Sequence, residues 1–172
     1  MLNRRFALLG LAALCVAACD APDAASPEAS NLIVRNITVD TSKITGVEGR
    51  EIVVAPAQIS KDLLSALRTS LAKAGTGNAD IIVQVQQVEL VSRGASVAFL
   101  QSNIKAILTV RDASTGQDIV PPTAITGFSE QFRLGGVVGV VTAPSAEQDY
   151  QQTLRGFAST VRDRVYGTDT AA

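Results

Sequence analysis

Residues 102–112 (SNIKAILTVRD) alternate apolar and polar side chains more regularly than any other stretch of this sequence. Successive side chains of a β-strand point to opposite faces of the sheet, so such alternation is typical of a strand with one buried face. The apolar side comprises Ile104, Ala106, Leu108 and Val110, and the polar side comprises Asn103, Lys105, Thr109 and Arg111, with Ile107 among them. We therefore expect a sheet whose apolar face needs a covering layer.

Two segments with helical periodicity can supply that layer. The first is predicted over 59–75, with Ser60 as N-cap, Gly75 as its stop and an apolar stripe of Leu64, Leu67 and Leu71. The second is predicted to begin at Ser145, which forms a capping-box pattern with Gln148, and to end at Gly167. Its stripe comprises Tyr150, Leu154, Phe157, Val161 and Val165.

The remaining apolar stretches predict further strands. They cover 31–40, 51–56, 79–92, 117–120 and 123–133. The alternation slips at Gln86 and Gln87, which predicts a bulge. Pro121 and Pro122 are expected to end a strand, because proline has no N–H to donate. The fold class is therefore α+β: a two-layer sandwich, with a mainly antiparallel sheet of four or five strands and two amphipathic helices on one face.

The start of the chain has the pattern of a targeting segment. Arg4 and Arg5 precede an uncharged apolar run over 6–18, which is too short to span a bilayer, and the run ends in Val16-Ala17-Ala18-Cys19. This leader resembles that of bacterial lipoproteins. The resemblance implies a signal peptide over 1–18 and a lipidated Cys19. A flexible tether is expected over 19–30, because after Cys19 this segment contains two prolines and no side chain more apolar than alanine. A single α+β domain over 31–167 and a disordered tail over 168–172 are expected to follow.

An ordinary secretory leader that leaves Cys19 as a free thiol is the alternative. Asp20, directly after Cys19, resembles the aspartate that retains lipoproteins of enteric bacteria in the inner membrane. It therefore favours the inner over the outer membrane. Either way the domain is expected in the periplasm. With no histidine and one cysteine left after cleavage, a zinc or iron–sulfur site is nearly excluded. Loss of Arg4 and Arg5 takes the formal net charge from −1 to −3, which argues against nucleic-acid binding.

The segment RLGGVVGVVTAP (133–144) is apolar, rich in glycine and without charge after Arg133. It is not a phosphate-binding loop, because no lysine followed by serine or threonine comes after its glycines. Two interpretations stay open: an exposed interface that touches lipid or a partner, or a buried connection that completes the core. The candidate interface residues are Gly135, Gly136, Val137, Val138, Gly139, Val140 and Val141.

No catalytic constellation is visible: no histidine is available as a base, and no serine lies in a GxSxG setting. We expect no enzyme, no cofactor and no metal. In architecture alone, the chain resembles small accessory lipoproteins of envelope transport or assembly machines. That likeness implies a non-enzymatic, protein-binding subunit held to the membrane by the lipid on Cys19. The alternative function is a carrier of a small molecule or lipid, with an apolar cleft near 135–141.

Overall fold

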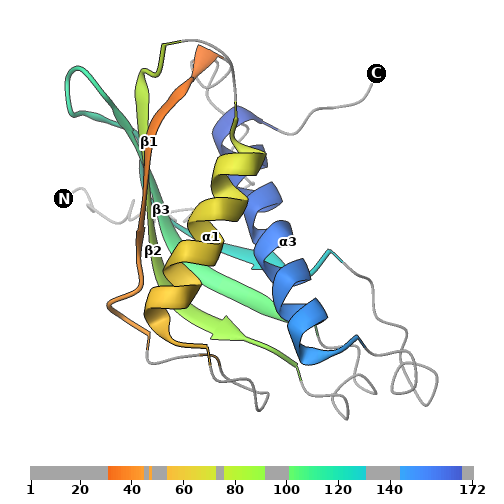
Figure 1. The fold of residues 1–172 in the computed structure, drawn as a ribbon. Coiled ribbons are helices and arrows are strands. Elements are labelled where there is room, and N and C mark those ends of the chain that lie inside the picture. The colour runs from red at the N-terminus through yellow and green to blue at the C-terminus, as the bar shows by residue number, and fades with distance from the viewer. Residues whose placement is uncertain are drawn as a thin grey trace, which may run out of the picture.

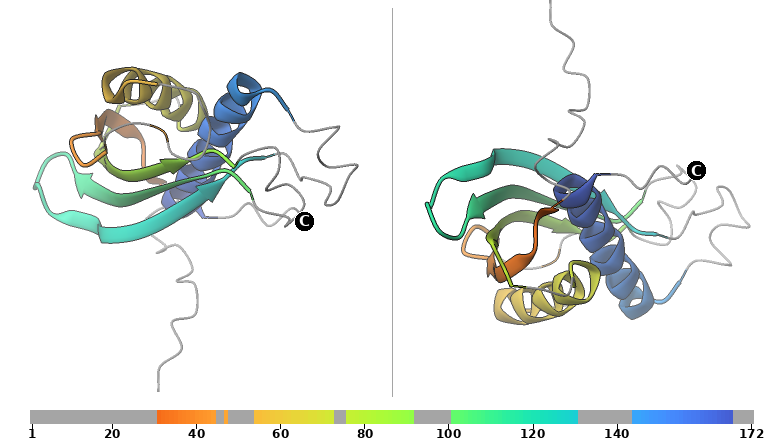
Figure 2. Two further views of the ribbon diagram at one scale, coloured as in Figure 1. Left: turned by 90° about the horizontal axis from the view of Figure 1, so that it is seen from below. Right: turned by 90° about the horizontal axis from the view of Figure 1, so that it is seen from above.

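The computed structural model describes residues 31–44, 47, 54–72, 76–91, 101–130 and 144–167. Four strands and two helices follow one another in the order β1 (Val34–Asp40), α1 (Pro56–Ser70), β2 (Ala79–Glu89), β3 (Asn103–Asp112), β4 (Asp118–Phe128) and α3 (Ala146–Tyr166). The strands form one sheet, and both helices lie on the same side of it (Figure 1, Figure 2). The predicted α+β sandwich with two helices on one face is confirmed.

The sheet is mixed, with the strand order β1-β2-β3-β4. β1 and β2 are parallel and are connected through α1, because a parallel pair needs a crossover. β2, β3 and β4 are antiparallel neighbours, and residues 113–117 turn the chain from β3 to β4. The antiparallel pairs make the sheet mainly antiparallel, as expected. β1 and β4 are its two edge strands.

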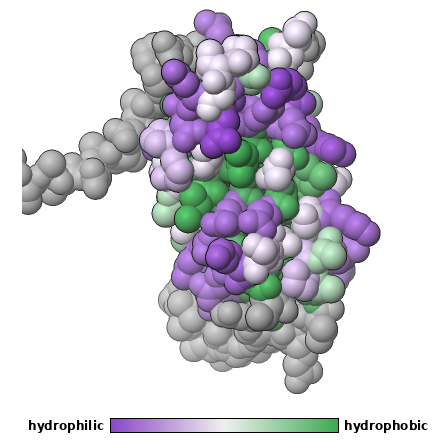
Figure 3. All heavy atoms as spheres, turned by 90° about the vertical axis from the view of Figure 1, so that its left-hand side faces the viewer, coloured by the Kyte–Doolittle hydropathy of each residue, from purple (hydrophilic) through white to green (hydrophobic). Residues whose placement is uncertain are grey.

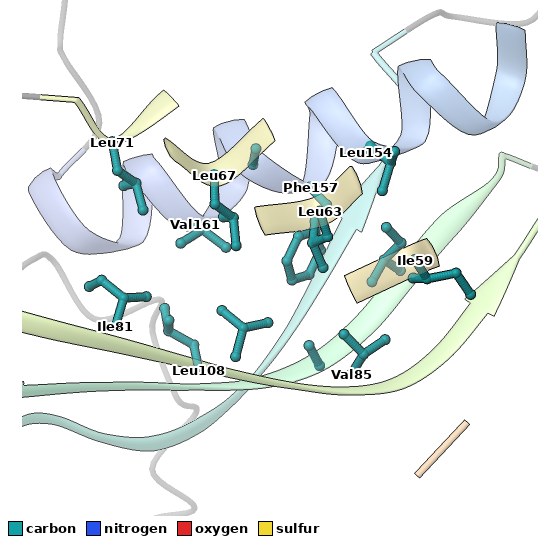
Figure 4. Close-up of a cluster of buried hydrophobic side chains, with 14 of the residues drawn as sticks. Ile59, Leu63, Leu67, Leu71, Ile81, Val85, Leu108, Leu154, Phe157 and Val161 are labelled. Atoms are coloured by element: carbon teal, nitrogen blue, oxygen red, sulfur yellow. The ribbon is translucent and has the colours of Figure 1, made fainter. Parts of the chain in front are cut away.

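The core lies between the sheet and the helices. The four apolar side chains predicted to share one face of β3 are all buried there, and so are alternate residues of β2 from Ile81 to Val85. Figure 4 shows side chains of both helices converging on these strands, among them Leu63, Leu67 and Phe157. The pattern of β2 changes at a bulge between Val85 and Gln87, after which Val88 is buried. The predicted bulge is therefore confirmed.

The helix α1 begins earlier than the sequence pattern predicted. Its first helical residue is Pro56, and Ala55 is the N-cap without a side-chain hydrogen bond. Proline suits this position, because backbone N–H groups in the first turn have no acceptor within the helix, so the missing N–H costs no hydrogen bond. Ser60 is not the N-cap: it lies inside the helix, and its hydroxyl donates to the Val39 carbonyl oxygen over 3.1 Å. The buried stripe also differs from the predicted one: it comprises Ile59, Leu63, Leu67 and Leu71 at a regular spacing of four, and Leu64 is half-buried.

The helix α3 follows its prediction closely. The Ser145 hydroxyl accepts from the Gln148 backbone N–H over 3.1 Å, and the Gln148 side chain accepts from the Ser145 N–H over 3.0 Å. This is the capping box, which satisfies two amide groups that a helix start otherwise leaves unpaired. All five predicted stripe residues are buried. Gly167 ends the helix at a φ of 83°, a conformation that other residues rarely adopt.

Pro121 and Pro122 do not end a strand, as was expected, but lie within β4. The expectation was wrong because β4 is an edge strand. A proline there loses no ladder hydrogen bond if its nitrogen faces away from β3. The register with β3 shifts at this point, since Leu108 pairs with Thr123 and Val110 pairs with Val120. The two predicted strands on either side are thus one strand, and the sheet has four.

Candidate functional site

The side of the sheet turned away from α1 and α3 is called the open face here. No helix or strand among the described residues covers it. Figure 3 looks onto this side and shows an apolar zone with hydrophilic residues above and below it. Among the described residues the helices bury only one face of the sheet, which makes the open face a candidate surface for a partner.

The middle of the open face is an apolar band made of Ile82, Ile107 and Ala124, with Thr109 among them. Thr109 is directly opposite Ile82, and Ile107 is directly opposite Ala124. Thr109 is only 7% exposed although no second layer lies over it, because its neighbours on adjacent strands crowd around it. A band of this kind loses unfavourable contact with water when a partner covers it.

Phe128 lies at the end of β4, on the same face. It is 50% exposed and is the one exposed large hydrophobic side chain among the described residues. Its cross-strand partner is Asn103, whose amide donates to Glu89 over 3.3 Å and to the Gln101 carbonyl over 3.4 Å. The Oδ1 atom of Asn103 is buried and has no hydrogen-bond partner among the described residues. This end of the open face thus combines an exposed aromatic ring with polar groups.

Four charged residues cross the other end of the open face, one from each strand. In strand order they are Arg35, Asp80, Arg111 and Asp118, so that positive and negative charges alternate. This set is called the charge row. Asp80 and Arg111 are cross-strand partners in the register of β2 and β3. Their positions depend on strand pairing between segments far apart in the sequence.

Each outer member of the charge row forms an ion pair with its inner neighbour. The Arg35 Nε atom donates to Asp80 over 2.9 Å, and its Nη1 atom donates to the Ala113 carbonyl oxygen over 3.0 Å. Hydrogen bonding to Asp80 raises the pKa of Arg35 above its ordinary value. The Arg111 Nε atom donates to Asp118 over 3.0 Å. These exposed pairs contribute little to stability, so their arrangement matters mainly for what the surface can recognise.

A groove of about 420 Å³ lies between α1 and α3. Its lining combines charged residues, among them Asp62, Arg155 and Glu130, with apolar ones such as Leu154. Asp62 accepts a hydrogen bond from the Tyr150 hydroxyl over 3.1 Å, and burial raises the pKa of that hydroxyl. The groove opens between the helices rather than between helices and sheet, where apolar side chains fill the space.

A buried polar cluster ties α3 to the ends of β2 and β3. The Ser102 hydroxyl donates to Asp149 over 2.6 Å and accepts from the Val91 backbone N–H over 3.0 Å. Ser102 and Asp149 are both 0% exposed. Buried polar groups are costly unless hydrogen-bonded, so this cluster fixes the position of the helix start over the sheet.

Replacing Ser102 with alanine is expected to destabilise the domain by about 1–3 kcal/mol, because it leaves the Val91 N–H and an Asp149 oxygen without this buried partner. Chemical denaturation followed by circular dichroism measures the change. The exposed Ser65, replaced with alanine, is the control. Equal free energies of unfolding for the two variants would contradict a role for the cluster.

The candidate residues named from the sequence lie outside the described residues. This holds for Cys19 and for the segment from Gly135 to Val141. Their neighbours can be placed: Pro144 is at the start of α3, at the end of the sheet where β2 and β4 finish. Asn31 lies at the opposite end, where Asn78 and the β3–β4 turn are found, and its carbonyl accepts from the Asn78 amide over 3.4 Å.

The described residues contain no cluster of three or more His, Cys, Asp or Glu side chains that could hold a metal ion. No helix within the same part of the chain is long and apolar enough to cross a membrane. The apolar band of the open face was missed in the sequence because its residues come from three strands whose pairing the pattern does not reveal. The signal that could have found it is Ile107, an apolar residue on the polar side of its strand.

The sequence matches no protein-family model and no curated protein. Solved structures resemble it distantly. A protein from Caulobacter crescentus described as a putative lipoprotein is 11% identical, with 76% of this chain and 87% of that chain covered and a TM-score of 0.36. A Xanthomonas campestris protein of the DUF330 family is 10% identical, with 74% and 79% covered and a TM-score of 0.40. A PelC dodecamer from Paraburkholderia phytofirmans is 13% identical, with 71% and 90% covered and a TM-score of 0.30. At these TM-scores, function has to be argued from the residues of this chain.

Proposed function

We propose that this chain is a lipid-anchored protein of the cell envelope whose domain, without catalytic activity, binds another protein as an accessory subunit of a transport or assembly machine. The observation that carries the proposal is the open face, with its apolar band and the exposed Phe128 ring. Apolar side chains gathered on one uncovered face are typical of protein-binding surfaces. The lipid anchor is supported by the leader that ends in Cys19.

The position of Asn31 bears on how the domain would stand on a membrane. The tether over 19–30 joins the domain at the end that carries the β3–β4 turn. Its residues after Cys19 reach at most about 35–40 Å when extended. The sheet extends from that end along its strands, so the plane of the open face would stand roughly parallel to the membrane normal and the face would point sideways. A tethered domain could then offer the apolar band to a neighbour in the same membrane.

The alternative function is a carrier of a small molecule or lipid. Its predicted cleft near 135–141 lies outside the described residues. The groove between α1 and α3 is of a size that small ligands need, but its charged lining suits a polar ligand better than a lipid tail. The open face therefore supports protein binding over carriage.

The test is a quantitative pull-down from mildly solubilised envelopes with the full chain, tagged at its C-terminus. Wild type is compared with Cys19→Ser, with Ile107→Asp on the apolar band, and with Ser65→Asp on the exposed side of α1 as the matched control. The proposal expects one protein at stoichiometric yield with wild type and the control. It expects at least a tenfold loss with Ile107→Asp, because a buried unpaired carboxylate is costly.

The same samples report the mass of the N-terminal peptide. A lipidated Cys19, together with membrane release of Cys19→Ser, is expected. Equal recovery of the bound protein with Ile107→Asp and Ser65→Asp would remove the open face from the proposal. Recovery of the chain with nothing bound would overturn protein binding, and an unmodified Cys19 would overturn the anchor.

A further inference from the structure

The charge row alternates in sign across the four strands, so that one copy of the row is complementary to a second copy in the reverse order. Read across the sheet from β1 to β4, its signs are plus, minus, plus, minus for Arg35, Asp80, Arg111 and Asp118. Read in the reverse direction, every sign is opposite. The side chains of all four remain partly exposed, from 23% for Asp80 to 52% for Arg35. They are therefore available to a partner without breaking their own ion pairs.

A two-fold axis parallel to the strands, between β2 and β3, places a second copy face to face with the first. This operation exchanges β1 with β4 and β2 with β3. Arg35 of one copy then lies over Asp118 of the other, and Asp80 lies over Arg111, so each charge meets its opposite. Two-fold interfaces need such self-complementarity, because the same patch is used on both subunits.

The same operation brings the apolar bands together. Ile82 on β2 is placed over Thr109 on β3, and Ile107 on β3 over Gln84 on β2, so that the isoleucine side chains of both copies gather around the axis. Stacked sheets lie about 10 Å apart, which leaves room for the interdigitated side chains of two faces. The apolar contact would supply binding energy, and the charge row would set the alignment.

The size of the open face fits a weak, reversible pair. Four strands about 4.8 Å apart, with about eight residues each rising about 3.3 Å, span about 19 by 26 Å, or about 500 Å². Two such faces give about 1,000 Å², near the lower limit for a biological interface. Confinement to a membrane raises the local concentration and so favours a pair that is weak in solution.

The two-fold axis along the strands also keeps both Asn31 residues at the same end of the pair. Both tethers could then reach one membrane surface. An axis in the plane of the face but perpendicular to the strands would put the tethers at opposite ends and would lay the charge row on the end that carries Phe128. The pairing of opposite charges and the position of the tethers therefore both favour the axis parallel to the strands.

We infer that the open face binds a second copy of this chain, aligned in parallel by the charge row. The inference rests on the proposed function for the use of this face, and it names the partner. The accessory subunit is then a dimer in which α1 and α3 of each copy lie on the outside, away from the interface.

The test exploits the symmetry of the row. Full chains with two different tags are produced in the same cells, and capture of one tag is followed by quantification of the other. The row-reversed variant carries Arg35→Glu, Asp80→Arg, Arg111→Glu and Asp118→Arg, which keeps an opposite charge next to each member within the domain. Wild type is expected to capture wild type, and row-reversed chain to capture row-reversed chain. Capture between the two is expected to fall about tenfold or more, because like charges would face each other.

Two further measurements keep the test decisive if the reversed row folds poorly. Ile107→Asp is expected to abolish capture of the second tag, while Ser65→Asp leaves it intact. Raising the salt concentration is expected to weaken wild-type capture, since exposed charges are screened. Full capture between wild type and a folded row-reversed chain would overturn the inference, as would capture that is indifferent to both Ile107→Asp and salt. A monomeric chain that instead retains a different protein through Ile107 would overturn the inference and leave the proposed function standing.

Discussion

Replacing Gly156 with alanine is expected to destabilise the domain by about 3 kcal/mol or more, the upper range for overpacking a core. A Cβ atom at this position would lie 1.9 Å from the Phe128 carbonyl oxygen and 3.1 Å from the Glu130 nitrogen. Both obstacles are backbone atoms at the end of β4, so neither can rotate away. The whole of α3 would have to move off the strand, and the buried contacts of Phe157 and Val161 would loosen with it.

The direction of this effect is informative because alanine is otherwise the better helix former, by about 1 kcal/mol over glycine. Thermal unfolding of Gly156→Ala is compared with that of Ser159→Ala, a half-buried position on the same helix. A melting temperature at or above that of wild type for Gly156→Ala would mean that α3 does not approach β4 as closely as described.

The second large effect is expected at Phe157, whose replacement with alanine should cost about 3–5 kcal/mol through lost burial and the cavity that remains. Phe157 is 0% exposed, and a Cβ atom on Gly127 would lie only 2.4 Å from the Phe157 Cα atom. The helix and the strand are therefore in direct backbone contact here, which limits how far the site can collapse after truncation.

Phe128 provides the matched comparison for this experiment. It is the same residue type, but it lies in β4 and is half exposed on the opposite face of the sheet. Phe128→Ala is expected to cost less than about 1 kcal/mol, the range of surface positions. Urea denaturation measures both free energies of unfolding. Similar losses for the two variants would mean that the open face is covered in the folded domain.

The extent to which the sequence predicted the structure differs from element to element. The helix α3 could be predicted from its cap to its end, because Ser145, Gln148 and Gly167 are local signals that tertiary contacts do not override. The start of α1 was missed, because two local signals indicate different starts. Pro56 is suited to the first helical position, whereas Ser60, four residues later, is a common N-cap residue. The double proline was misread because strand order, which makes β4 an edge, is not a local property.

The candidate surface could be predicted only in part. Alternation placed Lys105 and Arg111 on the polar side of β3, and that side is the open face. The charge row was not foreseen, because Arg35 and Asp80 are 45 residues apart and meet only through the register of β1 with β2. Which charges line up across a sheet depends on pairing between distant segments, and a one-residue slip would have moved them to the other face.

The double proline in β4 has a consequence for how chains of this protein can associate. An edge strand with free N–H and C=O groups is a template on which sheets of many molecules grow into fibres. Pro121 and Pro122 have no N–H group to donate, and the strand has a register shift at this point, which makes it a poorer template for a flat extended sheet. Lateral polymerisation from this side of the sheet is thereby discouraged. Contacts between neighbours are left to the broad faces of the molecule.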